Sequence, residues 1–126
     1  METQKNNQQP SLYERLGGEQ RVRKILNDVL DRNSNNPLIG NHFRQVDMNR
    51  LKQLVFEFFS MGTGGPHTYT GRDTRSAHAH LVLNEKDFEL SNEDVIIAFK
   101  ENGVAQTEID EVIGILNSLK GEVLGV

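Results

Sequence analysis

The 126-residue sequence contains no cysteine, which excludes disulfides, thiolate metal ligands and a cysteine nucleophile together. It also has no apolar run of membrane-spanning length. Its 14 basic and 18 acidic residues are interspersed, so the net charge of -4 leaves no basic stripe for phosphates. We therefore expect a soluble protein without nucleic-acid or membrane partners, in the cytoplasm, whose reducing conditions a cysteine-free chain fits.

Several catalytic signatures are also missing. The chain has no P-loop, Rossmann glycine pattern, HExxH zinc motif or nucleophile elbow, and no internal repeat. Residues 1–10 are polar and lack the apolar stretch of a signal peptide, so we expect a flexible tail there. The remaining residues, 11–126, have the length of one globular domain.

Apolar residues recur at helical spacing along most of the chain, and no segment alternates with a period of two, so we expect an all-α fold. Ser11 with Glu14 forms a capping box, and Asp47 is a suitable N-cap. The expected helices run from Ser11 to Gly17–Gly18, Glu19 to about Asn33, Met48 to about Met61, Asp73 to about Leu83, Ser91 or Asn92 to Gly103, and Thr107 through Val123. The glycine-rich segment from Gly62 to Gly71 is expected to be an ordered, functional loop.

One histidine is placed to bind a metal. On a helix, His78 shares a face with Leu81 and Val82, whereas His80 is rotated about 200° from His78. A neutral imidazole is a good iron ligand, and the carbonyl of Thr74 one turn back could hold its other ring nitrogen. Spacing alone, however, favours a core histidine satisfied by a backbone hydrogen bond.

Four stretches together are similar to a known family. They are SLYERLGG (11–18), HFRQVDMNRLK (42–52), FEFFSMGTGGPHTYTGR (56–72) and RSAHAHL (75–81). In kind, order and spacing they resemble the group I truncated haemoglobins, which are short globins with a two-over-two helical sandwich. The resemblance covers essentially the whole chain after Pro10 and implies one truncated globin domain.

The resemblance implies a haem b cofactor whose iron is bound by His78, with Phe43 packed against the porphyrin. It places Arg50, Tyr69 and Arg75 near the haem propionates, where a guanidinium pairs well with a carboxylate. The alternative is that these three are ordinary surface residues. The other expected haem contacts are Leu51, Phe58, Thr74, Leu81 and Phe99.

On the opposite side of the iron, the resemblance gives a ligand pocket lined by Leu30, Leu51, Leu54 and Val55. The family commonly has tyrosine where Leu30 stands, and glutamine or histidine at one of the others. No hydrogen-bond donor remains here, and bound oxygen gains from a donor whereas carbon monoxide gains little. Tight oxygen storage and nitric-oxide dioxygenation are therefore in doubt. These residues could equally serve core packing.

The remaining histidines receive minor roles. His42 could reach the iron as a sixth ligand, but we discount it because the distal helix supplies leucines, and we expect a five-coordinate ferrous iron. His67 and His80 are expected to be solvent-exposed. The last helix has no histidine for a covalent link to haem. The connection from His80 to Phe88 is shorter than in many relatives by about one helical turn.

The sequence thus favours a protein that reversibly binds oxygen and other diatomic gases, carbon monoxide and nitric oxide among them, over an enzyme. One alternative is a nitric-oxide detoxifying or peroxidase-type haem enzyme served by an unidentified reductase. Another is a globin-fold gas sensor or interaction module, including one that has lost its haem.

Overall fold

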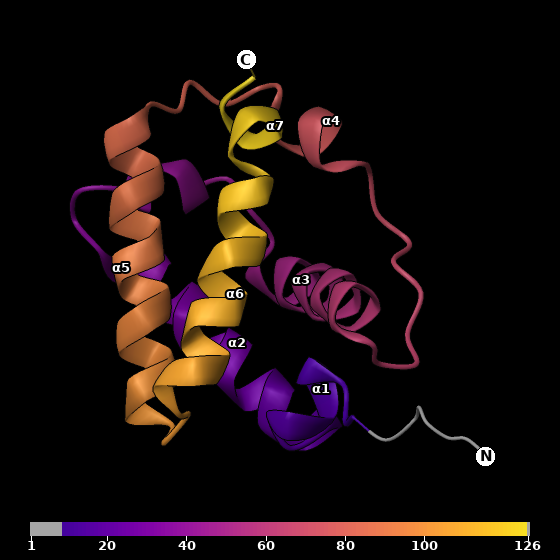
Figure 1. Cartoon of the computed structure of the whole chain (residues 1–126). Coiled ribbons are helices and arrows are strands. Elements are labelled where there is room, and N and C mark those ends of the chain that lie inside the picture. The colour runs from indigo at the N-terminus through magenta and orange to yellow at the C-terminus, as the bar shows by residue number, and fades with distance from the viewer. Residues whose placement is uncertain (1–8, 126) are drawn as a thin grey trace.

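The computed structural model describes residues 9–125, so Val126 and most of the tail expected over residues 1–10 lie outside the described residues. Its helices are α1 (Leu12–Arg15), α2 (Glu19–Asn35), the 3-10 helix η2 (Gly40–Phe43), α3 (Met48–Thr63), α4 (Thr74–His78), α5 (Glu85–Glu101), α6 (Gln106–Ser118) and α7 (Lys120–Leu124). No strand occurs among residues 9–125, which confirms the all-α expectation (Figure 1). Within this range no helix is both long and apolar enough to cross a membrane.

Local hydrogen bonds set the starts of the early helices as expected. The Ser11 hydroxyl accepts from the Glu14 amide at 3.1 Å, and the Glu14 carboxylate accepts from the Ser11 amide at 3.0 Å, which completes the capping box. Asp47 accepts from the Arg50 amide at 3.2 Å and so caps α3. Gly17 follows α1 with φ of 109°, a backbone conformation that favours glycine.

The last helix, predicted to run from Thr107 through Val123, is interrupted at Leu119 and divides into α6 and α7. Two predicted boundaries around α4 and α5 are also wrong. The helix expected to reach Leu83 ends at His78, and the next begins at Glu85 rather than after Ser91 or Asn92. Asn84 and Asp87 form a capping box, with bonds of 2.9 and 3.0 Å, and Asn84 has extended backbone angles. Residues 79–83 form turns and irregular backbone between α4 and the extended Asn84 cap, so no helical face exists there and Val82 is 93% exposed rather than inward-facing.

The core is built mainly by α2, which packs on α5 and α3, and by α5, which packs on α6. In Figure 1, α5 and α6 run side by side, and α3 is seen nearly end-on beside them. The buried cluster is made of Leu12, Tyr13, Leu16, Val22, Ile25, Leu26, Val29, Phe56, Val95, Ala98, Phe99, Ile109 and Val112. These residues come from α1 and the residue that follows it, α2, α3, the second half of α5 and the first half of α6.

Candidate functional site

The rest of the molecule is packed much less completely. Among the described residues, none from 64 to 93 and none from 113 to 125 is fully buried. Apolar side chains in and around these segments are half-buried and lie outside the core cluster; they are Phe43, Val46, Leu51, Leu54, Phe58, Leu81, Leu83, Phe88, Leu90, Leu119, Val123 and Leu124. Apolar surface that stays in contact with water lacks the roughly 25 cal/mol per Å² of stabilisation that burial provides. This part of the chain is therefore suited to an apolar partner.

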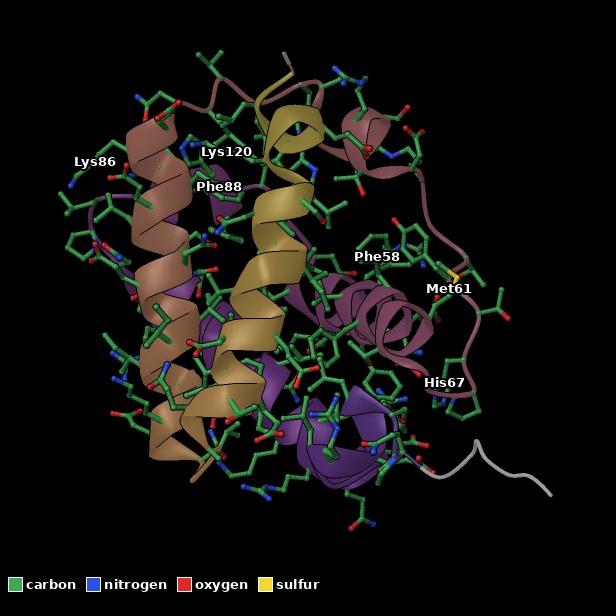
Figure 2. The ribbon with its side chains drawn as sticks, in the orientation of Figure 1. Phe58, Met61, His67, Lys86, Phe88 and Lys120 are labelled. Carbon is green, nitrogen blue, oxygen red and sulfur yellow. The ribbon has the colours of Figure 1, made fainter. Side chains whose placement is uncertain are left out.

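The packing of the helices agrees with this. Among the described elements, α4 packs extensively only on α7, and α3 only on α1 and α2, with no more than isolated contacts between α3 and α4. The axes of helices that pack together lie about 8–10 Å apart. The axes of α3 and α4 therefore lie farther apart than those of a packed pair. Phe58 lies on the side of α3 toward α4 (Figure 2).

His78 is the last residue of α4 and is half-buried. Its Nδ1 lies 2.8 Å from the carbonyl oxygen of Thr74, as the sequence predicted. A carbonyl can only accept, so Nδ1 carries the proton, and in the neutral ring Nε2 keeps a lone pair. No hydrogen bond to Nε2 is found among the described residues. This arrangement fits a histidine ligand to haem iron, because metal-bound imidazoles donate their other N–H in this way.

The four residues expected on the ligand side lie on two helices that pack together. Leu30 on α2 is only 7% exposed and lies outside the core cluster. Leu51, Leu54 and Val55 are half-buried on α3, and Val55 also packs against the core. None of the four side chains has a hydrogen-bond donor.

The aromatic residues expected at the cofactor occupy two environments. Phe43 and Phe58 are half-buried, and the Phe58 ring meets Tyr69 edge-on at 5.1 Å between centroids. Phe99 is instead a core residue, 1% exposed, with its ring 6.4 Å from that of Phe59. Leu81 is half-buried in the turn after α4. The haem contacts of these residues, including Phe99, stay predictions.

The residues expected near the haem propionates are spread over α3, the following loop and α4. Arg50 and Arg75 are exposed. Tyr69 is half-buried, its hydroxyl donates to the Arg72 carbonyl, and burial raises the pKa of its phenol. Arg75 is on the same helix as His78 and lines the same cavity. Their role at the propionates stays a prediction.

The loop between α3 and α4 is fastened to α3 by His67, which corrects the expectation that His67 is exposed. His67 Nδ1 lies 2.9 Å from the buried Ser60 hydroxyl, and its ring packs edge-on against Phe56 at 4.7 Å. Its Nε2 lies 3.5 Å from a Glu19 carboxylate oxygen on α2. His67 occurs where the loop passes the end of α3 (Figure 2). His80 is exposed, as predicted.

The loop is also hydrogen-bonded to α3 through Glu57, which was not among the residues predicted from the sequence. One oxygen of its carboxylate accepts from the Thr70 amide at 3.0 Å and from the Thr70 hydroxyl at 2.7 Å. Hydrogen bonds from Gln53 and then Thr70 lower the pKa of the Glu57 carboxyl. The loop is therefore ordered, as predicted, and it joins the distal helix to the helix of His78.

His42 is directed toward α5. Its Nε2 lies 3.7 Å from the Asp87 carboxylate, and both side chains are largely buried, with 18% and 19% exposure. The pair connects η2, which ends at Phe43, with the first turn of α5.

Comparisons with known proteins agree with this geometry. Residues 11–124 match the model of the family described as bacterial-like globin. A group 1 truncated hemoglobin from Synechocystis sp. is 33% identical over 109 residues, 83% of this chain and 88% of that protein. Another from Mycolicibacterium paratuberculosis is 28% identical over 113 residues, 90% of this chain and 83% of that protein.

Solved structures show the same fold. The 2/2 hemoglobin from Synechococcus sp., determined in the cyanomet state with covalently attached heme, matches with a TM-score of 0.87 and 30% identity, covering 93% of this chain and 100% of that one. The truncated hemoglobin from Tetrahymena pyriformis matches with a TM-score of 0.87 and 24% identity, covering 91% and 98%. The predicted two-over-two helical sandwich is confirmed.

Proposed function

Because this chain belongs to the bacterial-like globin family, as a truncated haemoglobin, we propose that it holds haem b through His78 and reversibly binds diatomic gases at a five-coordinate iron. Oxygen is the nominal ligand, and the carbon monoxide and nitric oxide that share its size are also accommodated. The proposal includes a location in the cytoplasm and a reductase that returns the iron to its ferrous state.

The observation that carries the proposal is the hydrogen bond from His78 Nδ1–H to the Thr74 carbonyl. It holds the imidazole in the tautomer whose Nε2 can bind a metal, on a helix that faces half-buried apolar side chains. Haem iron, when bound, supplies an open coordination position for a gas. His78 would supply the imidazole that holds the iron, and the half-buried apolar side chains nearby would limit the access of water to it.

The side chains on the ligand side favour weak binding of oxygen. Leu30, Leu51, Leu54 and Val55 offer no donor to a ligand that acquires negative charge. We infer that oxygen dissociates rapidly and that carbon monoxide is held without such a penalty. This favours gas exchange over tight storage and over reactions that need a long-lived oxygen adduct.

The first test compares two histidines of the same segment. We expect His78→Ala to abolish stable haem retention and His80→Ala, at an exposed position, to leave it nearly unchanged. The haem-to-protein ratio after gel filtration measures both. Equal loss in the two variants, or full retention by His78→Ala with a normal iron–histidine signal, contradicts the assignment.

The second test concerns the sixth coordination position. We expect the ferrous protein to be five-coordinate, with one broad visible band between the Soret band and the red, because His42 lies against Asp87 rather than free to move. Two sharp bands, as in a six-coordinate low-spin haem, would mean that an internal ligand binds. His42→Phe would then identify that ligand by restoring the single band.

A further inference from the structure

The helix that carries His78 is too short to hold its own position. α4 has five residues, and its N-terminus is capped by the Asp73 carboxylate, which accepts from the Ser76 amide at 3.3 Å. Isolated helices shorter than about 12–15 residues are marginal in water. Loop or turn residues, 64–73 and 79–84, flank α4 on both sides. The position of His78 therefore depends on what α4 packs against.

The element against which α4 packs is α7, the five-residue helix at the C-terminal end of the described chain. The two lie together near the C-terminus in Figure 1. The chain bends into α7 at Leu119, where the Ser118 hydroxyl donates to the Ile115 carbonyl at 2.5 Å and the Leu119 amide to the Leu116 carbonyl at 3.0 Å. Such local side-chain bonds bend helices.

α7 also contacts the start of α5 through Lys120. Lys120 Nζ lies 3.4 Å from the Glu85 carboxylate and 5.9 Å from the centroid of the Phe88 ring. Phe88 and Lys120 are neighbours between α5 and α7 in Figure 2. α7 thus packs on the short helix α4 and forms a surface ion pair with the first turn of the long helix α5.

A cavity of about 360 Å³ lies between α4 and α7. His78 and Leu81 line it from the end of α4 and the turn that follows, and Val123 and Leu124, both half-buried, line it from α7. These two residues are therefore the apolar side chains of α7 that share this pocket with the histidine. Because α4 packs on α7, shortening these two side chains removes apolar volume from that contact.

We propose that α7 positions His78, with Val123 and Leu124 as positioning residues, so that the C-terminal helix sets how firmly haem is held. This inference rests on the proposed function, because it assumes that His78 binds the iron. In this proposal the residues of α7 do not contact the gas. They affect the iron–histidine bond by fixing the position of α4.

The experiment compares Val123→Ala/Leu124→Ala with Val82→Ala, which removes the same methyl groups as Val123→Ala from a side chain that is 93% exposed. In the double variant we expect faster amide exchange of α4 in the apoprotein and a lower iron–histidine stretching frequency in the ferrous holoprotein. Transfer of haem to an excess of apomyoglobin should be about tenfold faster, the effect of 1.4 kcal/mol. Val82→Ala should match the unchanged protein in all three measurements.

Two further variants keep the result interpretable. Val123→Ile/Leu124→Met keeps apolar side chains of similar size and should restore the stretching frequency. If the core amides of α2 also lose protection in the double alanine variant, Leu124→Ala alone replaces it. Unchanged α4 exchange and unchanged haem transfer in Leu124→Ala and the double variant would overturn the inference. If the unchanged protein holds no haem, the proposed function fails instead, and α4 exchange in the apoprotein still tests the contact with α7.

Discussion

The half of the molecule around α2 and the half around α4 use similar apolar residues but bury them differently. In the first, Ile25, Phe56 and Phe99 are at most 1% exposed. In the second, which contains residues 64–93 and 113–125, no described residue is fully buried. The first half completes its core with its own side chains, whereas the second leaves apolar surface for a partner to cover.

Polar groups show the same contrast. At the α2–α5 contact, the buried carboxylate of Asp94 accepts from Asn33 at 2.9 Å and from Asn36 at 3.0 Å. Buried polar groups need such partners. In the second half, Nε2 of His78 has none among the described residues, which agrees with the proposal that it binds iron. The difference between the halves is therefore one of partner rather than of composition.

The largest expected effect tests this comparison with two phenylalanines of α3, which lies between the halves: Phe56 belongs to the core, and Phe58 lies on the side toward α4 (Figure 2). In the apoprotein, Phe56→Ala should lower the free energy of unfolding by about 3–5 kcal/mol, since Phe56 is a core residue. Phe58→Ala should cost less than about 2 kcal/mol there, because its ring is only half-buried. Urea denaturation measures both.

Adding haem should sharpen this result. If Phe58 contacts the cofactor, the cost of Phe58→Ala should rise in the holoprotein, while that of Phe56→Ala should change little. Equal costs for the two variants in the apoprotein would mean that the halves do not differ as described.

A smaller effect is expected on the ligand side, where Leu30 is buried outside the core cluster. Leu30→Tyr should slow oxygen dissociation by about one to two powers of ten, since a hydrogen bond to a charged acceptor contributes roughly 1.5–3 kcal/mol. Carbon monoxide dissociation should change much less. Stopped-flow replacement of oxygen by carbon monoxide compares the variant with the unchanged protein. Equally slow release from both would reveal an unidentified donor.

The smallest effect concerns the loop that links the two halves. The pKa of the Glu57 carboxyl lies below its ordinary value of 4.5, chiefly because Gln53 and then Thr70 donate to it. A carboxyl whose pKa is lower in the folded than in the unfolded chain stabilises the folded state. This stabilisation is complete above the ordinary pKa and is lost as the pH falls through the lowered value. In the apoprotein, protection of the Thr70 amide should therefore decline below about pH 4.5.

Glu57→Gln is the matched variant for this measurement. It should weaken Thr70 protection at neutral pH and remove the acid transition, once exchange rates are corrected for intrinsic pH dependence. A transition at the same pH in Glu57→Gln would assign it to another group.

The site was accessible from the sequence to different degrees. The resemblance to group I truncated haemoglobins is confirmed by the family match over residues 11–124 and by the relatives. The hydrogen bond between His78 and Thr74 was predictable because it spans one helical turn. The capping box of Asn84 and Asp87 was also visible in the sequence, but Ser91 and Asn92 stand closer to the apolar run from Val95 and misled the prediction.

Interactions between distant residues could not be predicted in this way. The burial of His67 depends on the loop folding back onto Ser60 and meeting Glu19 of another helix. The separate position of Leu30, outside the core cluster, depends on how α2 packs against α3 and α5.

The sequence by itself determined the all-helical class, most helix starts, the apolar faces and the tautomer of His78, because each depends on residues within about one turn of one another. Only the tertiary structure decided that α4 ends at His78, that α7 packs against it, and that one half of the molecule stays incompletely buried. Those features depend on which distant surfaces meet. Such contacts are selected by the packing of the whole chain rather than by local periodicity.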